Sequence, residues 1–310
     1  MNRNEQIYNA FHVTLSHEAQ EKLDAATRAV SIFQNDFQPK NFDEQLAAQE
    51  YEKQFAGLYT HGSTAIEGST LTLVETQSVI ENKYIPTTIA KVKDMYAVRG
   101  VYEGYNYLKE CLAQSRELTS EFIKDVHERT ALECDVRVRG SFRTTPVKIL
   151  GTDVHTSEPA DIYQDIDALL YAYQIFEGSA IVKAAAFHIM FENIHPFIDG
   201  NGRCGRHLMN YVLMQEHIVP IAITQDMRAQ YLETLNAFQA EQNCEAFVVF
   251  ISNLIEQEAH ARMSIIKHTR EFLAHRNPSQ EEILRKARKS YDELLKHKQK
   301  NCPHAQDRHI

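Results

Sequence analysis

Apolar residues recur every three or four positions along most of the chain, and this spacing is typical of amphipathic helices. Capping residues mark several starts: Ser16 precedes the first pattern, and Thr72 and Glu75 form a Thr-x-x-Glu capping box. Residues 1–15 are polar and are expected to fray. The predicted helices span 17–33, 43–58, a segment after Thr72, 88–113, 119–133, 161–176, 179–194, 203–217, 226–240, 244–270 and 280–299.

One segment breaks the helical pattern. The run "VKIL" is followed by Gly151 and then by "TDVH", which predicts a short β-hairpin over 147–155. It is the only good strand candidate in the sequence. The pattern therefore predicts an all-α protein that carries one small hairpin.

Composition narrows the class of protein. The 310 residues are 43% hydrophobic, enough for the core of one large domain, or of one domain plus a smaller appendage. The formal charge of −9 argues against bulk binding of nucleic acid. Five widely spaced cysteines argue against a disulfide scaffold or a structural zinc site. Without a signal-peptide pattern or a run of about 18 apolar residues, we expect a cytoplasmic protein outside the membrane.

Candidate catalytic and ligand-binding residues are concentrated in the segment "HPFIDGNGRCGR", residues 195–206. Its Asp-Gly and Asn-Gly pairs are strong signals for a turn between strands. The flanking segments 179–194 and 203–217 are instead long and helical in pattern, and the first is apolar nearly all round. The sequence therefore predicts helix, loop, helix.

The composition of this loop suits an anion. Gly200 and Gly202 permit positive φ and close approach of a ligand to the backbone, so that successive amides form a nest at the start of the next helix. Arg203 and Arg206 share one face of that helix and oppose its dipole. The unfavourable interaction of these two arginines with the helix dipole is explained if a polyphosphate binds between them.

Two further residues complete the set. Asp199 is a lone carboxylate beside the nest, suited to holding a Mg²⁺ that bridges phosphate oxygens. His195 ends the preceding helix, and an imidazole with an ordinary pKa near 6.5 suits proton abstraction. Each residue alone has an ordinary structural explanation. The ordered set within twelve residues is much harder to explain in that way.

The sequence resembles the Fic-domain family at this point. "HPFIDGNGRCGR" matches every fixed position of the signature His-x-Phe-x-Asp/Glu-Gly-Asn-Gly-Arg-x-x-Arg. The resemblance extends over roughly 60–255. Residues 141–151 look like the family's flap, and 63–73 look like its inhibitory motif, which here comprises Ser63, Glu67 and Gly68.

The resemblance implies an all-α Fic fold and transfer of AMP from ATP to a Tyr, Ser or Thr hydroxyl of a target protein, with release of pyrophosphate. It implies that His195 is the base, that Asp199 holds Mg²⁺, and that Glu67 inhibits by pairing with Arg206. The nucleotide-binding residues that it implies are Val147, Lys148, Ile149, Leu150, Gly200, Asn201, Gly202, Arg203, Arg206, Tyr231 and Gln239.

Two positions distinguish this chain within the family. A sister group that resembles toxin phosphotransferases has Lys where this chain has Gly202, which favours nucleotidyl transfer here. Many relatives carry Asn where Gln239 falls, whereas Tyr231 remains in place. The flap residues Val147 to Leu150 are equally compatible with strand addition to a target and with a simple covering hairpin.

Alternatives stay open at this stage. Glu67 before Gly68 could be an ordinary helix end. In some relatives the same glutamate positions a water that removes AMP, so a de-AMPylase is possible, as is a nucleotide-binding adaptor without turnover. His127 and His188 are expected to be core histidines, and a redox role for Cys204 has little support.

The expected organisation has three parts: an N-terminal helical region over 1–60, a Fic domain over 61–255 with the inhibitory motif at 63–68, and a helical extension over 256–310. The charged helix at 280–299 is expected to be solvated or to bind a partner. A homodimer is possible, and neither nucleic acid nor membrane is an expected partner.

Overall fold

The computed structural model describes residues 2–148, 156–275 and 289, apart from the side chain of Gln239. The described helices are α1 (Arg3–Phe11), α2 (His17–Asp36), α3 (Phe42–Ile66), α4 (Leu73–Ile80), α5 (Ile89–Ala113), α6 (Ser120–Thr130), α7 (Ile162–Ile175), α8 (Ala180–Ile194), α9 (Asn201–Gln215), α10 (Arg228–Glu241) and α11 (Glu245–Ala274), with a 3₁₀ turn at Gln225–Met227. Over these residues no strand occurs, and the predicted all-α class is confirmed.

Helix α8 lies at the centre of the core. It contacts α1, α7, α9 and α11, and the residues from Ala184 to Phe191 are all buried. This burial explains why its sequence is apolar nearly all round instead of along one stripe. Because α8 and α9 are consecutive and packed together, the loop between them is held by the core at both ends.

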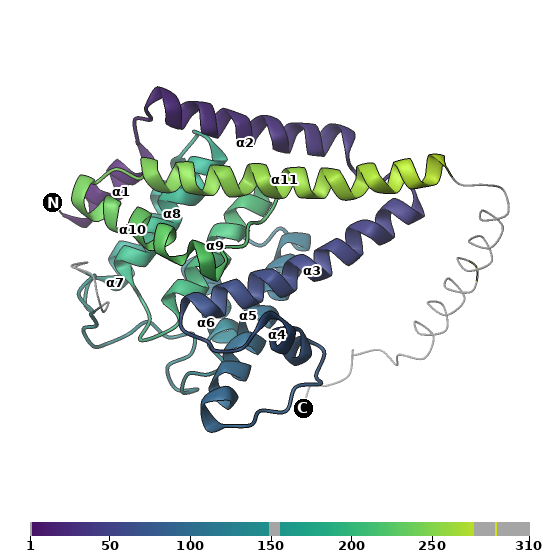
Figure 1. Cartoon of the computed structure of the whole chain (residues 1–310). Coiled ribbons are helices and arrows are strands. Elements are labelled where there is room, and N and C mark those ends of the chain that lie inside the picture. Colours follow the sequence, from purple (N-terminus) through teal and green to yellow (C-terminus); the bar gives the residue numbers. More distant parts are fainter. Residues whose placement is uncertain (1, 149–155, 276–288, 290–310) are drawn as a thin grey trace.

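Three long helices enclose this core. Helix α11 runs between α2 and α3 (Figure 1) and packs along α2 for much of its length. Helix α3 crosses the molecule so that its C-terminal end reaches α9 and the 3₁₀ turn. The fold therefore places Ser63 and Glu67 beside Arg206 on α9, although 143 and 139 positions separate them from it in the sequence.

The prediction for residues 1–15 is wrong. Helix α1 begins with a complete capping box between Asn2 and Glu5. Its residues Ile7, Ala10 and Phe11 are buried against α7 and α8. Their i, i+3, i+4 spacing is a helix signal, but the segment is so short that its polar positions dominated the pattern.

Other predicted features have mixed outcomes. Ser16 caps α2, and Thr72 with Glu75 caps α4 through the expected capping box. The hairpin predicted over 147–155 lies outside the described residues except for Val147 and Lys148, which are not in a strand. The predicted helix over 280–299 also lies outside them, apart from residue 289.

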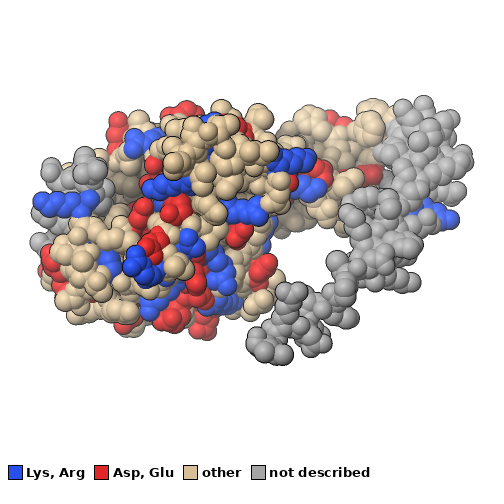
Figure 2. Space-filling model, turned by 90° about the horizontal axis from the view of Figure 1, so that it is seen from below, with Lys and Arg blue, Asp and Glu red and all other residues tan. Residues whose placement is uncertain are grey.

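The charged side chains that the structure describes on the surface do not indicate a nucleic-acid-binding face. Figure 2 shows acidic and basic side chains intermixed on the face seen from below. Among the described residues, this face therefore lacks the single-sign surface that a nucleic-acid binder presents. None of the described helices is long and apolar enough to cross a bilayer.

Candidate active site

The α8–α9 loop is fixed by its own side chains. The amide nitrogen of Phe197 donates to Oδ1 of Asn201 at 2.8 Å, and Nδ2 of Asn201 donates back to the Phe197 carbonyl at 2.8 Å. Gly200 has a φ of +80° at the start of α9, a conformation that glycine adopts without strain. The Asn201 side chain thus braces the loop through the backbone of Phe197.

His195 ends α8 in the left-handed region, with φ of +52°. Its Nδ1 lies 3.3 Å from the carbonyl oxygen of Glu192. A carbonyl only accepts, so Nδ1 carries the proton and Nε2 keeps its lone pair. Burial lowers the pKa of His195 to about 4, against the opposing effect of that hydrogen bond. The imidazole is therefore neutral near pH 7, with the lone pair of Nε2 free, although the lowered pKa makes it a weaker base than an exposed histidine.

Arg143 reinforces this geometry. It is buried, and its guanidinium donates to the carbonyl oxygens of His195, at 2.8 Å from Nε, and of Thr145, at 2.9 Å from Nη1. A further bond joins Nη2 to the carbonyl of Ser157. One side chain thus ties the segment after α6 to the end of α8. The sequence analysis missed this role because the bonds go to backbone atoms that carry no residue-type signal.

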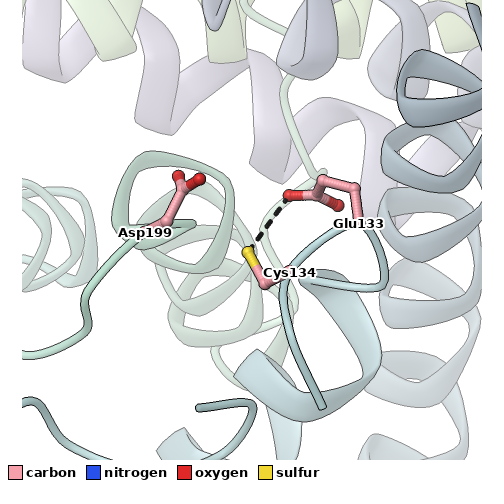
Figure 3. Close-up of side chains that lie close together, drawn as sticks. All are labelled: Glu133, Cys134 and Asp199. Atoms are coloured by element: carbon pink, nitrogen blue, oxygen red, sulfur yellow. Dashed lines mark hydrogen bonds between the residues drawn. The ribbon is translucent and has the colours of Figure 1, made fainter. Parts of the chain in front are cut away.

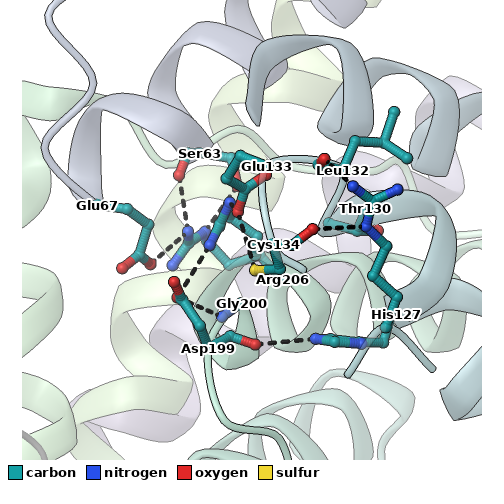
Figure 4. A network of polar contacts seen from close by, with 12 residues as sticks. Ser63, Glu67, His127, Thr130, Leu132, Glu133, Cys134, Asp199, Gly200 and Arg206 are labelled. Atoms are coloured by element: carbon teal, nitrogen blue, oxygen red, sulfur yellow. Dashed lines mark hydrogen bonds and ion pairs between the residues drawn. The ribbon is translucent and has the colours of Figure 1, made fainter. Parts of the chain in front are cut away.

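Arg206 is held by the end of α3 through its Nε and Nη2 atoms. Its Nη2 lies 2.8 Å from Oε1 of Glu67 and 2.8 Å from the Ser63 carbonyl, and its Nε donates to Oγ of Ser63 at 3.0 Å (Figure 4). The guanidinium is buried, whereas the Glu67 side chain remains 40% exposed. The structure thus brings Glu67 to Arg206, as the resemblance implied, and adds contacts from Ser63 that the sequence analysis did not predict.

The surroundings of Glu67 favour the ionised form of its carboxylate. Burial acts to raise the pKa of Glu67, but the charges of Arg206 and Arg203 and the hydrogen bond from Arg206 outweigh it, so the net pKa is lowered. Glu67 is therefore ionised near pH 7. A nucleotide that needs Arg206 has to displace a charged and hydrogen-bonded partner.

The end of α3 is itself anchored. Gly68 has a φ of +96°, and the amides of Gly68 and Ser69 donate to the carbonyls of Ala65 and Thr64, which is a Schellman cap. Arg228, at the start of α10, donates to the Ile66 carbonyl at 2.9 Å. The ordinary helix-end interpretation of Glu67 and Gly68 is thus correct, and it is compatible with the ion pair.

Arg203 has partners that the sequence analysis missed. Its Nη1 contacts Oε1 of Glu133, from the turn after α6, and its Nη2 lies 3.2 Å from Oδ1 of Asp199. The side chains of Arg203 and Glu133 are 5% and 2% exposed. Both signature arginines are therefore paired with carboxylates that lie outside their own helix. No motif marks Glu133 in the sequence, so only the fold reveals it.

Asp199 has a half-exposed carboxylate (Figure 3). Its Oδ1 also accepts from the amide of Gly200 at 2.6 Å. Its carbonyl lies 2.8 Å from Nε2 of His127, whose Nδ1 accepts from the amide of Gly140 at 3.0 Å. His127 is buried and stacked on Phe197, so it is a core histidine, as expected, that also braces the Asp199 backbone.

A second polar layer lies behind Arg206. The ring of Tyr231 stands 5.8 Å from the guanidinium carbon, and its hydroxyl lies 2.9 Å from Nε2 of His188. Glu192 is nearby, and burial raises its pKa to about 8, while Arg206 acts to lower it and Glu67 to raise it. Tyr231, which the resemblance gave a nucleoside role, is buried in this layer.

The remaining predicted nucleotide-binding residues are less defined. The carbonyl of Val147 accepts from Oγ1 of Thr156 at 3.0 Å, which ties the described start of the flap to its end. Ile149, Leu150 and the side chain of Gln239 lie outside what the structure describes. Cys204 is fully buried among core residues, which leaves a redox role without access.

Comparisons with known proteins agree with this geometry. The Fic/DOC family model matches residues 117–213, which include α6, the α8–α9 loop and most of α9. Residues 117–213 of the chain are therefore similar to the Fic/DOC family. The protein adenylyltransferases Fic of Drosophila grimshawi and Drosophila erecta are 31% and 30% identical to this chain over 200 residues, 64% of its length. The chain spans about two fifths of the length of these relatives, at 41% and 40%.

Solved structures show the same fold. Fic-1 of C. elegans (residues 134–508) aligns with a TM-score of 0.70 at 24% identity, covering 81% of this chain and 73% of that one. A Fic domain containing signaling protein from Bacteroides thetaiotaomicron aligns with a TM-score of 0.71 at 22% identity, covering 80% and 97%. The Fic fold therefore extends well beyond the matched family segment.

Proposed function

We propose that the chain is a protein adenylyltransferase that moves AMP from ATP to a Tyr, Ser or Thr hydroxyl of another protein, and that Glu67 inhibits it. The observation that carries the proposal is the buried Arg206 guanidinium, which Ser63 and Glu67 hold at the same time. The base of the reaction is His195, whose Nδ1 is bonded to the Glu192 carbonyl. The names of the Drosophila relatives agree with this activity.

The proposed reaction uses the groups in the loop. The target hydroxyl oxygen attacks the α-phosphorus of ATP, and its proton passes to Nε2 of His195. The bond from the α-phosphorus to the bridging oxygen breaks, and pyrophosphate leaves. The amides around Gly200 to Gly202 and the cation of Arg206 stabilise the phosphate charge, because phosphoryl chemistry depends mainly on positioning and charge neutralisation.

Asp199 fits the proposed Mg²⁺. Its carboxylate is a hard oxygen donor at the pocket, oriented by Arg203 and by the Gly200 amide. When bound, the ion would reduce the negative charge of the phosphates. Arg203, which pairs with Asp199, keeps that carboxylate facing the phosphate site.

The inhibition follows from competition. Glu67 and the terminal phosphate both need Nη2 of Arg206, so a nucleotide binds poorly, or out of line, while Glu67 is in place. Glu67 is also partly exposed toward the pocket, where a carboxylate can activate water. Removal of AMP by Glu67 is therefore the second candidate function.

The decisive experiment adds α-labelled ATP and Mg²⁺ to the wild type, Glu67→Gly and Glu67→Gly/His195→Ala in cell lysate. We expect label on protein with Glu67→Gly and none with the double variant. Equal labelling by both variants would exclude His195 as the base. No labelling by any variant would favour the nucleotide-binding adaptor.

Removal is tested in the same system. The labelled target is purified and returned to the wild type and to Glu67→Gly. A de-AMPylase releases label only with Glu67 present.

We also propose that the protein is cytoplasmic and a possible homodimer. Its proposed domain organisation is an N-terminal helical region over 1–60, a Fic domain over 61–255 and a helical extension over 256–310.

A further inference from the structure

Ser157, in the segment before α7, is bonded to the backbone that carries His195. Its amide donates to the carbonyl of Ile194 at 3.3 Å, and its own carbonyl accepts from Nη2 of Arg143. That Nη2 also donates to the Ile194 carbonyl at 3.4 Å, and the Arg143 amide donates to the carbonyl of Pro196 at 2.9 Å. The backbone on both sides of His195 is therefore fixed by two residues from elsewhere in the sequence.

A buried carboxylate fixes Ser157 in turn. Oγ of Ser157 donates to Oδ2 of Asp165, in the first turn of α7, at 2.5 Å. The same Oδ2 lies 3.7 Å from Nε of Arg3 on α1. Ser157 and Asp165 are 5% and 8% exposed. A continuous series of polar contacts thus runs from α1 through α7 to the backbone of His195.

Stability alone does not explain a carboxylate at residue 165. Burial raises the pKa of Asp165, although the hydrogen bond from Ser157 and the charge of Arg3 act to lower it. An apolar side chain would fill a buried position on α7 without the cost of desolvating a carboxylate. It would accept no hydrogen bond, however, and Ser157 would lose this contact with α7.

We propose that Asp165 is a positioning residue for the base His195, and that it acts through Ser157 and Arg143. His195 has a φ of +52°, a conformation that a residue other than glycine keeps only where its surroundings fix it. Without the bond from Ser157 to Asp165, the segment that Arg143 binds can shift, and the imidazole shifts with its backbone. The inference rests on the proposed function, in which His195 is the base.

The pKa of His195 reports the position of the imidazole, and NMR titration of the full nucleotide-free chain measures it without any transfer. Burial is the largest effect and lowers this pKa to about 4. The other groups that act on it are the Glu192 carbonyl and the charges of Arg143, Glu67 and Asp199. Because the variants used here keep all four of these residues, a changed pKa reports a change in the burial or position of the imidazole.

Two alanine variants break the series of contacts. We expect Asp165→Ala and Ser157→Ala each to raise the pKa of His195 by about 1, because the loosened segment admits water to the imidazole. Asp165→Asn keeps an oxygen that accepts from Ser157 and should retain the wild-type value. Asp167→Asn, at an exposed position on the same helix, is the matched control and should also retain it.

Transfer provides the second readout. In the Glu67→Gly background with α-labelled ATP in lysate, Asp165→Ala should lower kcat at least about tenfold and leave the KM for ATP nearly unchanged. The reason is that Arg206, which binds the terminal phosphate in the proposed function, has no contact with this series of residues. Asp165→Asn should restore kcat in the same background.

The buried His127 and His188 are internal references, and circular dichroism establishes that each variant is folded. An unchanged His195 pKa in both alanine variants would overturn the positioning role, as would an equal rise of the pKa of all three histidines. A rise confined to His195, with no labelling by any variant, would support the positioning role and contradict the proposed function alone.

Discussion

A Cβ added to Gly202 would come within 2.3 Å of Oε1 of Glu67 and 3.0 Å of Nη1 of Arg206. The Glu67 carboxylate therefore packs directly against the backbone at the start of α9. The absence of a side chain at residue 202 is what makes room for it. This relationship ties the second glycine of the signature to the inhibitory motif, in addition to any close approach of a phosphate.

Gly202→Ala should push the Glu67 carboxylate away from Arg206. We expect ATP to bind more tightly to Gly202→Ala than to the wild type. In a Glu67→Gly background the same substitution has no carboxylate to displace, so it should leave the affinity unchanged or weaken it. Calorimetric titration of ATP into the four proteins measures this difference. Equal weakening in both backgrounds would show that the methyl group disturbs only the nucleotide.

A substitution at Gly62 tests how closely α3 packs against the backbone of Ile223. A Cβ there would meet the backbone carbonyl oxygen of Ile223 at 2.3 Å, and a backbone atom cannot move aside cheaply. We expect Gly62→Ala to lower the free energy of unfolding by about 1–3 kcal/mol. Denaturant unfolding measures the change.

Gly57 provides the matched control on the same helix. A Cβ at Gly57 would meet only Oε1 of Gln77, at 2.9 Å, and that flexible side chain can shift. Alanine also favours the helix over glycine by about 1 kcal/mol. Gly57→Ala should therefore be neutral or stabilising. Equal destabilisation by both alanines would contradict the close contact of α3 with Ile223.

Glu192 makes the stability of the protein depend on pH. Its pKa is raised to about 8 by burial from an ordinary value of 4.5, so the folded state keeps a proton that the unfolded state has lost. The stabilisation is complete below pH 4.5 and is lost as the pH rises toward 8, at about 1.4 kcal/mol per pH unit.

Glu192→Gln removes this loss of stability with rising pH, because glutamine has a similar shape and does not ionise. The variant should gain stability over the wild type steadily between pH 4.5 and 8, and the difference should then level off. Taking the difference cancels the buried histidines, which have lowered pKa values and act at acid pH. A stability difference that does not change with pH would mean that Glu192 is ionised in the folded protein.

The sequence predicted the parts of this site that lie within one continuous loop. His195, Asp199, the two glycines and the two arginines are close together because they are close in sequence. Ser63 and Glu67 were placed through the resemblance, since no local pattern can bring the end of α3 to α9. Helix periodicity gave most of the fold, because each helix buries a stripe or, for α8, its whole surface.

Several long-range contacts of the site were not predicted from the sequence. Glu133 reaches Arg203 across 70 positions, and Arg143 holds the backbone of residue 195 across 52. Arg228 contacts a carbonyl on α3. Such bonds depend on how helices pack, and the carbonyl oxygens that they use are the same in every residue type.

The central claim is that Glu67 and the terminal phosphate of ATP compete for Arg206. The most direct measurement is the dissociation constant of ATP and of AMP for the wild type, Glu67→Gly, Arg206→Ala and the double variant. We predict that Glu67→Gly tightens ATP binding by about tenfold, equivalent to about 1.4 kcal/mol. The gain should be absent for AMP and absent in the Arg206→Ala background. An equal gain for AMP, or a gain that persists without Arg206, would contradict the competition.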